Sequence, residues 1–139
     1  MDINQNQIRF QFTMNLEEET KRITLEYIKT GCIGYHKLLK YINGNMKGDL
    51  DLSNTKVSHL PKYLKVGGWL DLCNTPITTL PKDLKVGDNL YLHKTYITSL
   101  PEELTVGGFL NLSNTPISKK HTIQELKQML PNLKGRILI

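Results

Sequence analysis

The feature that most constrains this chain is an internal repeat of twenty residues that begins at Gly48 and continues to Ser118. Written in register, the units read GDLDLSNTKVSHLPKYLKVG, GWLDLCNTPITTLPKDLKVG, DNLYLHKTYITSLPEELTVG and, incompletely, GFLNLSNTPIS. A unit of this size cannot bury its own apolar side chains, so each unit must stack on its neighbours. The repeat therefore predicts a solenoid whose function lies in its surfaces.

Each unit is expected to contribute two short strands. In an L-x-L tripeptide both leucines lie on one side of the strand and the middle residue lies on the other. Such tripeptides recur at Leu50/Leu52, Leu70/Leu72, Leu90/Leu92 and Leu110/Leu112, and a second set recurs at Leu64/Val66, Leu84/Val86 and Leu104/Val106. Stacking should place equivalent residues about 4.7–4.9 Å apart in two parallel ladders.

Glycine and proline recur at the expected corners between these strands. The glycines should supply the permissive backbone that a sharp corner requires, and the prolines should turn the chain without joining a ladder. They stand at Gly67, Gly87 and Gly107, with Gly68, Asp88 and Gly108 following, and at Pro61, Pro81 and Pro101.

A threonine recurs between inward-facing apolar residues, at Thr55, Thr75, Thr95 and Thr115. Because buried polar groups need hydrogen-bond partners, this column is predicted to be a buried ladder of hydroxyl groups that satisfies the backbone of the turn. A catalytic threonine is the alternative interpretation.

The pattern L-x-L-x-x-T-x-I-x-x-L-P resembles the leucine-rich repeat family over about half of the chain, and its short coils are similar to those of bacterial and phage-encoded leucine-rich repeat proteins. The resemblance implies a leucine-rich repeat solenoid, and with the segments that flank the repeat the expected fold is α+β, with an N-terminal strand/helix cap and a C-terminal helical cap. Thr replaces the family's Asn, and L-P-x-x-L-x-V-G-G places a second strand where the family has a helix. A flatter, straighter solenoid than the family's horseshoe is therefore expected.

Three segments are expected within one folded unit: an N-terminal cap over residues 1–47, the solenoid over 48–118 and a C-terminal cap over 119–139. In residues 7–14 apolar Ile8, Phe10, Phe12 and Met14 alternate with polar residues, which predicts a half-buried strand that pairs with the solenoid or with a partner. A helix should then begin at the N-cap Asn15 and end at Gly31.

A second, shorter helix is predicted from Tyr35 to Ile42, ended by Asn43 and Gly44. In the C-terminal cap, Thr122 and Glu125 form the capping box of a helix that Pro131 terminates. Residues 136–139 should then form a last strand, stacked on residues 110–112.

The composition of the chain limits the kinds of protein that it can be. A chain of 139 residues that is 39% hydrophobic and 22% charged is typical of one soluble globular domain. No apolar run approaches the roughly 20 residues needed to span a bilayer, and the polar start MDINQNQIRF lacks a signal-peptide core. The two cysteines, Cys32 and Cys73, fit a reducing compartment. A cytoplasmic protein is expected, and the resemblance implies a bacterium or an infected host cell.

The net charge of +5 is unevenly distributed. Residues 48–118 hold six lysines against seven acidic groups, residues 1–47 hold seven basic against five acidic groups, and residues 119–139 hold five basic against one. The repeats are thus close to neutral, which makes nucleic-acid binding by the solenoid an unfavoured interpretation.

The sequence shows no catalytic or metal-binding constellation, so an enzyme is not expected and no cofactor is assigned. The four histidines, His36, His59, His93 and His121, lack metal-ligand spacing. Asp51 and Asp71 stand on adjacent units, but a solvated strand face explains them better than paired acid/base catalysis. Cys73 is interpreted as an incidental thiol.

The outward positions of the first ladder are where the units differ most. By strand alternation, two columns share one outward side: Asp49, Trp69, Asn89 and Phe109, and Asp51, Asp71, Tyr91 and Asn111. Trp69 and Phe109 should lie about 9–10 Å apart, two rungs of the ladder, with Tyr91 on the rung between them. The predicted partner-binding residues are Trp69, Tyr91, Phe109, Asp51, Asp71, Asn111 and His93. Packing under a terminal cap is the alternative for the aromatic residues.

The favoured function is a non-enzymatic protein–protein interaction module. Resemblance to phage and bacterial repeat proteins implies an adaptor or an inhibitor of a host defence or regulatory protein. Two alternatives remain: an acidic partner docked on the opposite ladder at Lys65 and Lys85, and nucleic-acid binding by the basic C-terminal cap through Lys119, Lys120, Lys127, Lys134 and Arg136. The sequence does not fix the oligomeric state.

Overall fold

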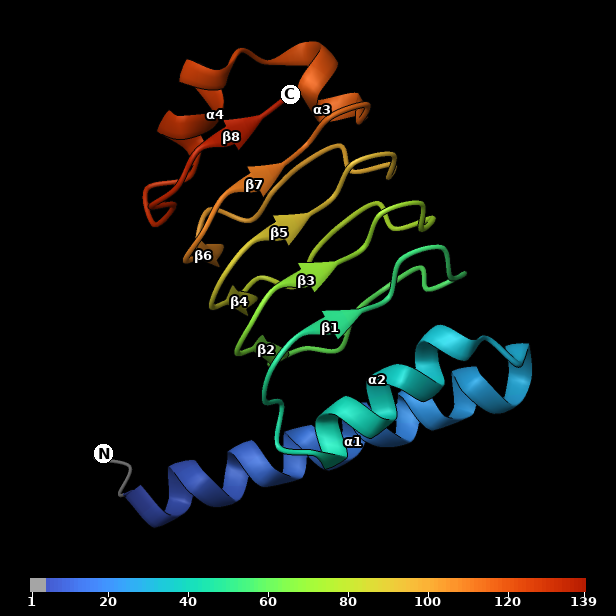
Figure 1. Ribbon diagram of the computed structural model, residues 1–139. Helices are drawn as coiled ribbons and strands as arrows, with labels where there is room; N and C mark the ends of the chain where they lie inside the picture. Colours follow the sequence, from blue (N-terminus) through green and yellow to red (C-terminus); the bar gives the residue numbers. More distant parts are fainter. Residues whose placement is uncertain (1–4) are drawn as a thin grey trace.

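A computed structural model describes residues 5–139, apart from the side chains of Phe10, Phe12 and Thr13. Figure 1 shows short parallel strands stacked between two helical caps. In chain order the elements are α1 Gln5–Thr30, α2 Ile33–Asn43, β1 Leu50–Asp51, β2 Lys65–Val66, β3 Leu70–Asp71, β4 Lys85–Val86, β5 Leu90–Tyr91, β6 Thr105–Val106, β7 Leu110–Asn111, α3 Pro116–Lys120, α4 Ile123–Met129 and β8 Ile137–Leu138.

The strands form two parallel sheets, one of five strands in the order β1-β3-β5-β7-β8 and one of three in the order β2-β4-β6. Leu50 pairs with Leu70, Leu70 with Leu90 and Leu90 with Leu110, so each coil advances by twenty residues. The last step, from Leu110 to Ile137, spans 27 residues because it includes α3 and α4. The predicted α+β solenoid with two ladders is confirmed.

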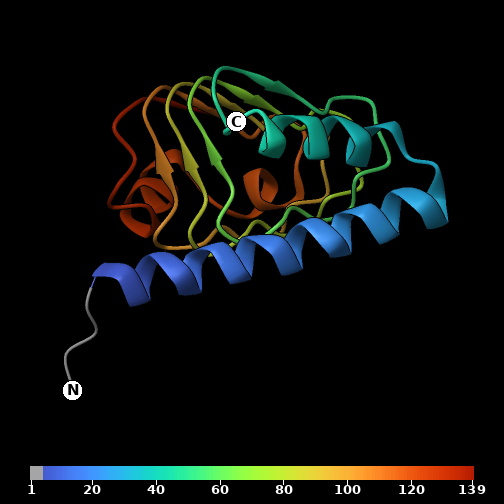
Figure 2. The same cartoon turned by 90° about the horizontal axis from the view of Figure 1, so that it is seen from below.

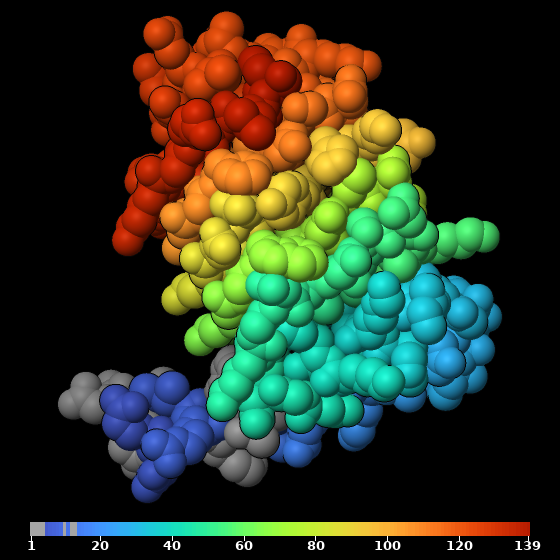
Figure 3. All heavy atoms as spheres, viewed as in Figure 1, coloured from blue at the N-terminus to red at the C-terminus, as the bar shows by residue number. Residues whose placement is uncertain are grey.

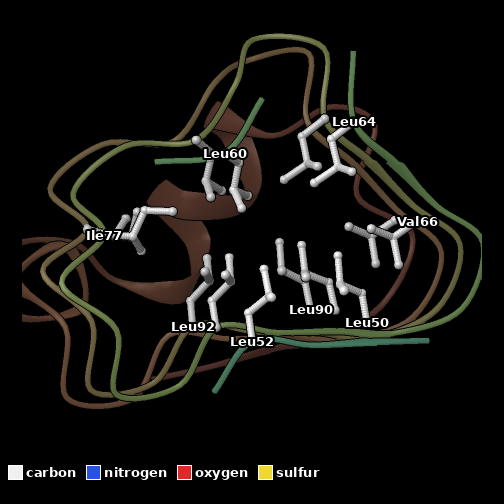
Figure 4. Close-up of a cluster of buried hydrophobic side chains, with 14 of the residues drawn as sticks. Leu50, Leu52, Leu60, Leu64, Val66, Ile77, Leu90 and Leu92 are labelled. Carbon is white, nitrogen blue, oxygen red and sulfur yellow. The ribbon is translucent and has the colours of Figure 1, made fainter. Parts of the chain in front are cut away.

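The core is a column of apolar side chains inside the coils. Figure 4 shows leucine, valine and isoleucine side chains from both strands and from the connecting turns pointing toward the centre of the coil. Leu70, Leu72, Leu90 and Leu92 are fully buried. Burial of each such side chain stabilises the fold by about 1.5–3 kcal/mol relative to exposure, so the stacked leucines hold the coils together.

The predicted threonine ladder is present. Each hydroxyl group is buried and donates to the carbonyl oxygen of the leucine three residues earlier. The Oγ1···O distances are 2.7 Å for Thr55 and Thr75, 2.6 Å for Thr95 and 2.5 Å for Thr115. Each hydroxyl group thus stabilises the turn that follows the first strand of its coil. The role of the threonine column is structural.

The residue before each threonine has a left-handed backbone, which the repeat did not lead us to expect. The φ angles are 58° at Asn54, 57° at Asn74, 59° at Lys94 and 57° at Asn114. Asparagine tolerates this region better than other side chains because it is short and polar. Asn74 also donates from Nδ2 to Oδ1 of Asn54 at 2.9 Å, which links two coils.

The corner glycines have a different role from the predicted one. Among the described glycines, only Gly31 and Gly48 have positive φ, so the corners do not require a backbone that other residues avoid. A Cβ atom on Gly87 would instead overlap the carbonyl oxygen of Gly67, and one on Gly107 would overlap that of Gly87. These glycines are needed because successive coils approach each other closely.

The predicted strand over residues 7–14 and the N-cap at Asn15 are wrong: both lie inside the 26-residue helix α1. Ile8 and Met14 are 49% and 42% exposed, while the side chains of Phe10 and Phe12 lie outside the described part. A helix satisfies its own backbone hydrogen bonds, whereas a strand here would need a free sheet edge, and α2 packs against β1 at that end. No Gly or Pro interrupts residues 5–30, so the helix extends through the alternating segment.

The rest of the N-terminal cap agrees with the prediction. Gly31 ends α1 with φ of 67°, and its N–H donates to the Tyr27 carbonyl at 2.8 Å. The helix α2 ends at Gly44. Figure 2 shows α1 and α2 side by side across the first coil. Among residues 5–139, no helix combines the length and apolar character needed to cross a membrane.

The C-terminal cap also matches the prediction. Thr122 Oγ1 accepts from the Glu125 N–H at 3.2 Å, and the Glu125 carboxylate accepts from the Thr122 N–H at 2.8 Å. The helix α4 ends before Pro131, and β8 pairs with β7. The short helix α3, which Thr115 caps, was not predicted.

Candidate protein-binding surface

The candidate site is the outward side of the five-stranded sheet, which we call the outer face. It carries three columns: Asp49, Trp69, Asn89, Phe109 and Arg136; Asp51, Asp71, Tyr91, Asn111 and Leu138; and Ser53, Cys73, His93 and Ser113. Their alternation with the buried leucines places them outward, and all of them except Cys73, which is buried, are at least partly exposed. Figure 3 shows this side of the molecule, and neither helical cap covers it.

Three aromatic side chains make a continuous row across the outer face. The Trp69 and Tyr91 ring centroids are 6.4 Å apart at an interplanar angle of 83°, and those of Tyr91 and Phe109 are 5.3 Å apart at 90°. All three are half-buried, against one another and the ladder. Edge-to-face pairs of this kind contribute about 0.5–1.5 kcal/mol each beyond burial, so the row also stiffens the stack.

The acidic and amide side chains of the second column each cap their own strand end. Asp51 Oδ1 accepts from the Ser53 N–H at 3.0 Å and from the Ser53 hydroxyl group at 2.6 Å. Asp71 Oδ1 accepts from the Cys73 N–H at 2.8 Å, and Asn111 Oδ1 from the Ser113 N–H at 3.0 Å. Each side chain thus uses one oxygen to hold the backbone two residues ahead.

The pKa of Asp51 is lowered from its ordinary value, first by the Ser53 hydroxyl hydrogen bond and further by the nearby charge of Lys37. Burial acts in the opposite direction and is outweighed. Asp51 therefore carries its negative charge at neutral pH, as a solvated carboxylate on the outer face.

The first column alternates between polar and aromatic residues, and the alternation has a structural cause. Asp49 Oδ1 accepts from the Trp69 N–H at 3.0 Å, and two coils later Asn89 Oδ1 accepts from the Phe109 N–H at 3.0 Å. Each polar side chain thus fixes the backbone that carries the next aromatic residue. The structural period of this column is two coils, although the sequence period is one.

This two-coil period explains why Asp88 stands where the other coils have Gly68 and Gly108. A Cβ atom on Gly68 would overlap Asp49 Oδ1, and one on Gly108 would overlap Asn89 Oδ1. In the coil of Asp88 the preceding column residue is Trp69, which has no oxygen to cross this position. A side chain is therefore tolerated there.

Cys73 and His93 contact each other in the third column, with Sγ and Nε2 2.7 Å apart. Burial, and then the charge of Asp71, raise the pKa of the Cys73 thiol, although Lys94 opposes the shift. A reactive cysteine needs the opposite shift, so the thiol acts here as a neutral neighbour of the imidazole. His93 Nδ1 is buried and has no hydrogen-bond partner among the described residues.

The outer face extends beyond the predicted columns through Arg136 and Leu138; Arg136 had been assigned only to the alternative basic surface of the C-terminal cap. Asn111 pairs with Leu138, and the Leu110 N–H donates to the Arg136 carbonyl at 2.8 Å, so both columns continue onto β8. The last predicted strand already contained this signal, because alternation assigns residues 136 and 138 to the outward side. Both side chains are exposed.

The two other predicted surfaces lie elsewhere. Lys65 and Lys85 are exposed and pair in register with each other and with Thr105 on the three-stranded sheet. The five basic residues of the C-terminal cap are exposed on α3, α4 and the segment before β8. Neither group brings aromatic side chains together as the outer face does.

Comparison of the chain with protein-family models, with curated proteins and with solved structures finds no match. Function is therefore inferred from the chemistry of the surfaces themselves.

Proposed function

We propose that this protein is a non-enzymatic protein-binding module that holds its partner on the outer face. The observation that supports the proposal is the row of Trp69, Tyr91 and Phe109, half-buried and in mutual edge-to-face contact on a side that neither cap covers. Large aromatic side chains at the centre of a surface are the usual anchors of protein interfaces.

The packing of the row favours binding because it lowers the entropic cost. Each aromatic ring already has a neighbour that restricts its rotamers, so less side-chain freedom is lost when a partner covers the ring. The backbone beneath is equally fixed, since the Trp69 and Phe109 amides are held by the side chains of Asp49 and Asn89. A rigid platform of this kind resembles a preformed interface.

On this proposal the chain is a small leucine-rich repeat protein that acts as an intracellular adaptor or inhibitor. The family assignment rests on the L-x-L-x-x-T-x-I-x-x-L-P repeat and on the parallel solenoid that it forms. The role as an inhibitor rests on the similarity of the coils to bacterial and phage-encoded proteins.

Quantitative affinity purification from the native cell, with tagged wild type and variants, tests this function. Trp69→Ala and Tyr91→Ala should each reduce the free energy of binding to the captured partner by at least about 2 kcal/mol. Calorimetry with the purified pair then measures this loss. Tyr96→Ala is the matched control, because Tyr96 is 63% exposed on a neighbouring turn and lies outside the outer face. Unchanged binding by both variants, with thermal melts showing intact folds, would exclude the outer face.

The same experiment separates the outer face from the lysine ladder. Lys65→Ala with Lys85→Ala should slow association and reduce its salt dependence, with little loss of affinity. If this variant alone fails to bind the partner, the binding site lies on the three-stranded sheet and not on the outer face.

A further inference from the structure

The aromatic row of the outer face continues onto the last strand. Trp69 and Phe109 belong to the first column and Tyr91 to the second, so the row changes column at every rung. Leu138 is 40% exposed and occupies the second column on β8, which is the next diagonal position after Phe109. These four side chains, which we call the apolar row, form one zigzag from β3 to β8. The zigzag spans three rungs, about 14–15 Å.

The other diagonal of the two columns is polar and borders the apolar row. It consists of Asp71, Asn89, Asn111 and Arg136. The first three accept a backbone N–H through Oδ1, at 2.8, 3.0 and 3.0 Å, so their positions on the face are fixed. An apolar centre with an ordered polar border is the usual composition of a protein interface.

The face of a sheet offers a partner side chains but no backbone hydrogen bonds, because the N–H and C=O groups of the strands lie in the plane of the sheet. The Leu90 N–H, for example, donates to the Phe109 carbonyl at 2.9 Å within the ladder. An extended partner segment over the apolar row would bury its own backbone groups without partners, which is costly. A helix satisfies its backbone internally, so it can be covered on one side at no such cost.

The spacing of the apolar row also favours a helix. Consecutive members are one rung apart, about 4.7–4.9 Å along the stack. Helix residues i, i+4, i+7 and i+11 face one side and cover about 16–17 Å. Alternate residues of an extended segment are about 6.6–6.8 Å apart and would cover about 20 Å in three steps. A helix along the stack can therefore place one apolar side chain at each member of the row.

The β8 end of the apolar row is basic. Arg136 is exposed, and in residues 5–139 its side chain forms no salt bridge or hydrogen bond. Residues 119–139 hold five basic groups against one acidic group, Glu125, which forms a salt bridge with a histidine of the same cap. Within the two columns the carboxylate nearest to β8 in the strand order is that of Asp71, three strands away, and Asp88 stands at the corner before β5. An acidic partner residue is complementary to this end.

We infer that the outer face binds an amphipathic helix of its partner, which lies along the stack with its apolar stripe on the apolar row and an acidic residue over Arg136. This inference rests on the proposed function, and it adds the secondary structure, the direction and the charge of the partner segment.

Trp69 is the only tryptophan in the chain, so its fluorescence reports binding to the apolar row. The probe is a synthetic peptide of about sixteen residues, built from alanine and glutamine, with leucine at positions i, i+4, i+7 and i+11 and with glutamates in one terminal turn. The control peptide has the same composition, with its leucines at alternate positions as in a strand. Titration of the helical peptide into the full chain should change the Trp69 emission and saturate, and the control should bind at least about tenfold more weakly.

Leu138→Ala tests whether the partner helix reaches β8. This variant should bind the helical peptide about three- to tenfold more weakly than wild type, because one of the four apolar contacts is lost. Ile139→Ala is the matched control and should bind normally. Ile139 is 48% exposed, but strand alternation places it on the other side from Leu138. Thermal melts check that both variants are folded.

An exchange of charges tests where the acidic residue lies. Arg136→Glu should weaken binding of the glutamate peptide by about tenfold, and a peptide with lysines in place of the glutamates should recover that loss with this variant alone. Lys56→Glu changes the net charge equally, on an exposed turn of the first coil, and should not discriminate between the two peptides.

Four results would overturn the inference: no saturable change in Trp69 emission, equal binding of the helical peptide and the control peptide, normal binding by Leu138→Ala, or no recovery in the charge exchange. A preference for a single-stranded oligonucleotide over the helical peptide would overturn it as well and would assign the surface to nucleic acid. If Trp69→Ala abolishes capture of the native partner while Leu138→Ala and Arg136→Glu both retain it, the proposed function stands and the helix inference fails.

Discussion

The carboxylate of Glu19, in the middle of α1, accepts a hydrogen bond from the backbone N–H of Lys62 at 3.0 Å, across 43 residues of sequence. Glu19 is only 5% exposed, and its other oxygen lies 3.1 Å from Arg22 Nη1. One helical turn earlier, Asn15 donates to the Tyr63 hydroxyl group at 3.2 Å. The helix is thus attached to one corner of the first coil.

Glu19→Ala should destabilise the fold by about 1–3 kcal/mol, because it removes the hydrogen bond that joins the buried Glu19 carboxylate to the Lys62 N–H. Chemical denaturation measures the loss. Glu18→Ala, an exposed neighbour on the same helix, should change stability by less than about 0.5 kcal/mol. Equal effects of the two substitutions would show that the contact with Lys62 does not anchor α1.

Thr75→Val should cost about 0.5–1.5 kcal/mol, since the Leu72 carbonyl loses the hydroxyl donor and keeps only the weaker 3.2 Å bond from the Thr75 N–H. Thr78→Val is the control, because Thr78 is exposed. Urea titrations of both variants compare the two positions. A neutral Thr75→Val would mean that the hydroxyl ladder contributes nothing to stability.

Gly68→Ala should destabilise by about 1–3 kcal/mol, because the added methyl group would displace Asp49 from the Trp69 N–H. Asp88→Ala, at the equivalent position of the next coil, should be tolerated within about 0.5 kcal/mol. Thermal melts distinguish the two. Equal tolerance would show that the two-coil alternation is not a structural constraint.

Lys94→Asn should stabilise the protein by about 0.5–1 kcal/mol, since it places asparagine at the one position of the left-handed column Asn54, Asn74, Lys94 and Asn114 that lacks it. The reciprocal change, Asn74→Lys, should be destabilising and would also remove the hydrogen bond to Asn54. Differential scanning calorimetry on both variants shows whether each substitution raises or lowers stability. A destabilising Lys94→Asn would contradict the left-handed backbone at Lys94.

The solenoid could be predicted from the sequence because its information is local and repeated. The alternation in L-x-L states which side of the strand is buried, and four recurrences fix the register between coils. The same alternation gave the outer face, including the Trp69–Tyr91–Phe109 row. Extending the two columns onto β8 would also have given Arg136 and Leu138.

What the sequence did not reveal depends on contacts between distant segments. The alternation in residues 7–14 covers too few residues to distinguish a strand from an exposed helix, and the absence of a free sheet edge decides for the helix. The burial of Glu19 follows from the docking of α1. From the sequence the corner glycines are read as turn residues. Only the stacked coils show that they lack a side chain because the backbone of the preceding coil lies against them.

The alternation of Asp49 and Asn89 with Trp69 and Phe109 also limits how such a protein can be lengthened or shortened. Removal of the coil that begins at Leu70 would bring Phe109 directly above Trp69, and the Phe109 amide would lose its acceptor. Duplication or deletion of two coils together would keep every polar residue beneath an aromatic one. A pair of coils can therefore be inserted or deleted without the loss of a side-chain acceptor, whereas a single coil cannot. Engineered or natural relatives of different length should differ by an even number of coils.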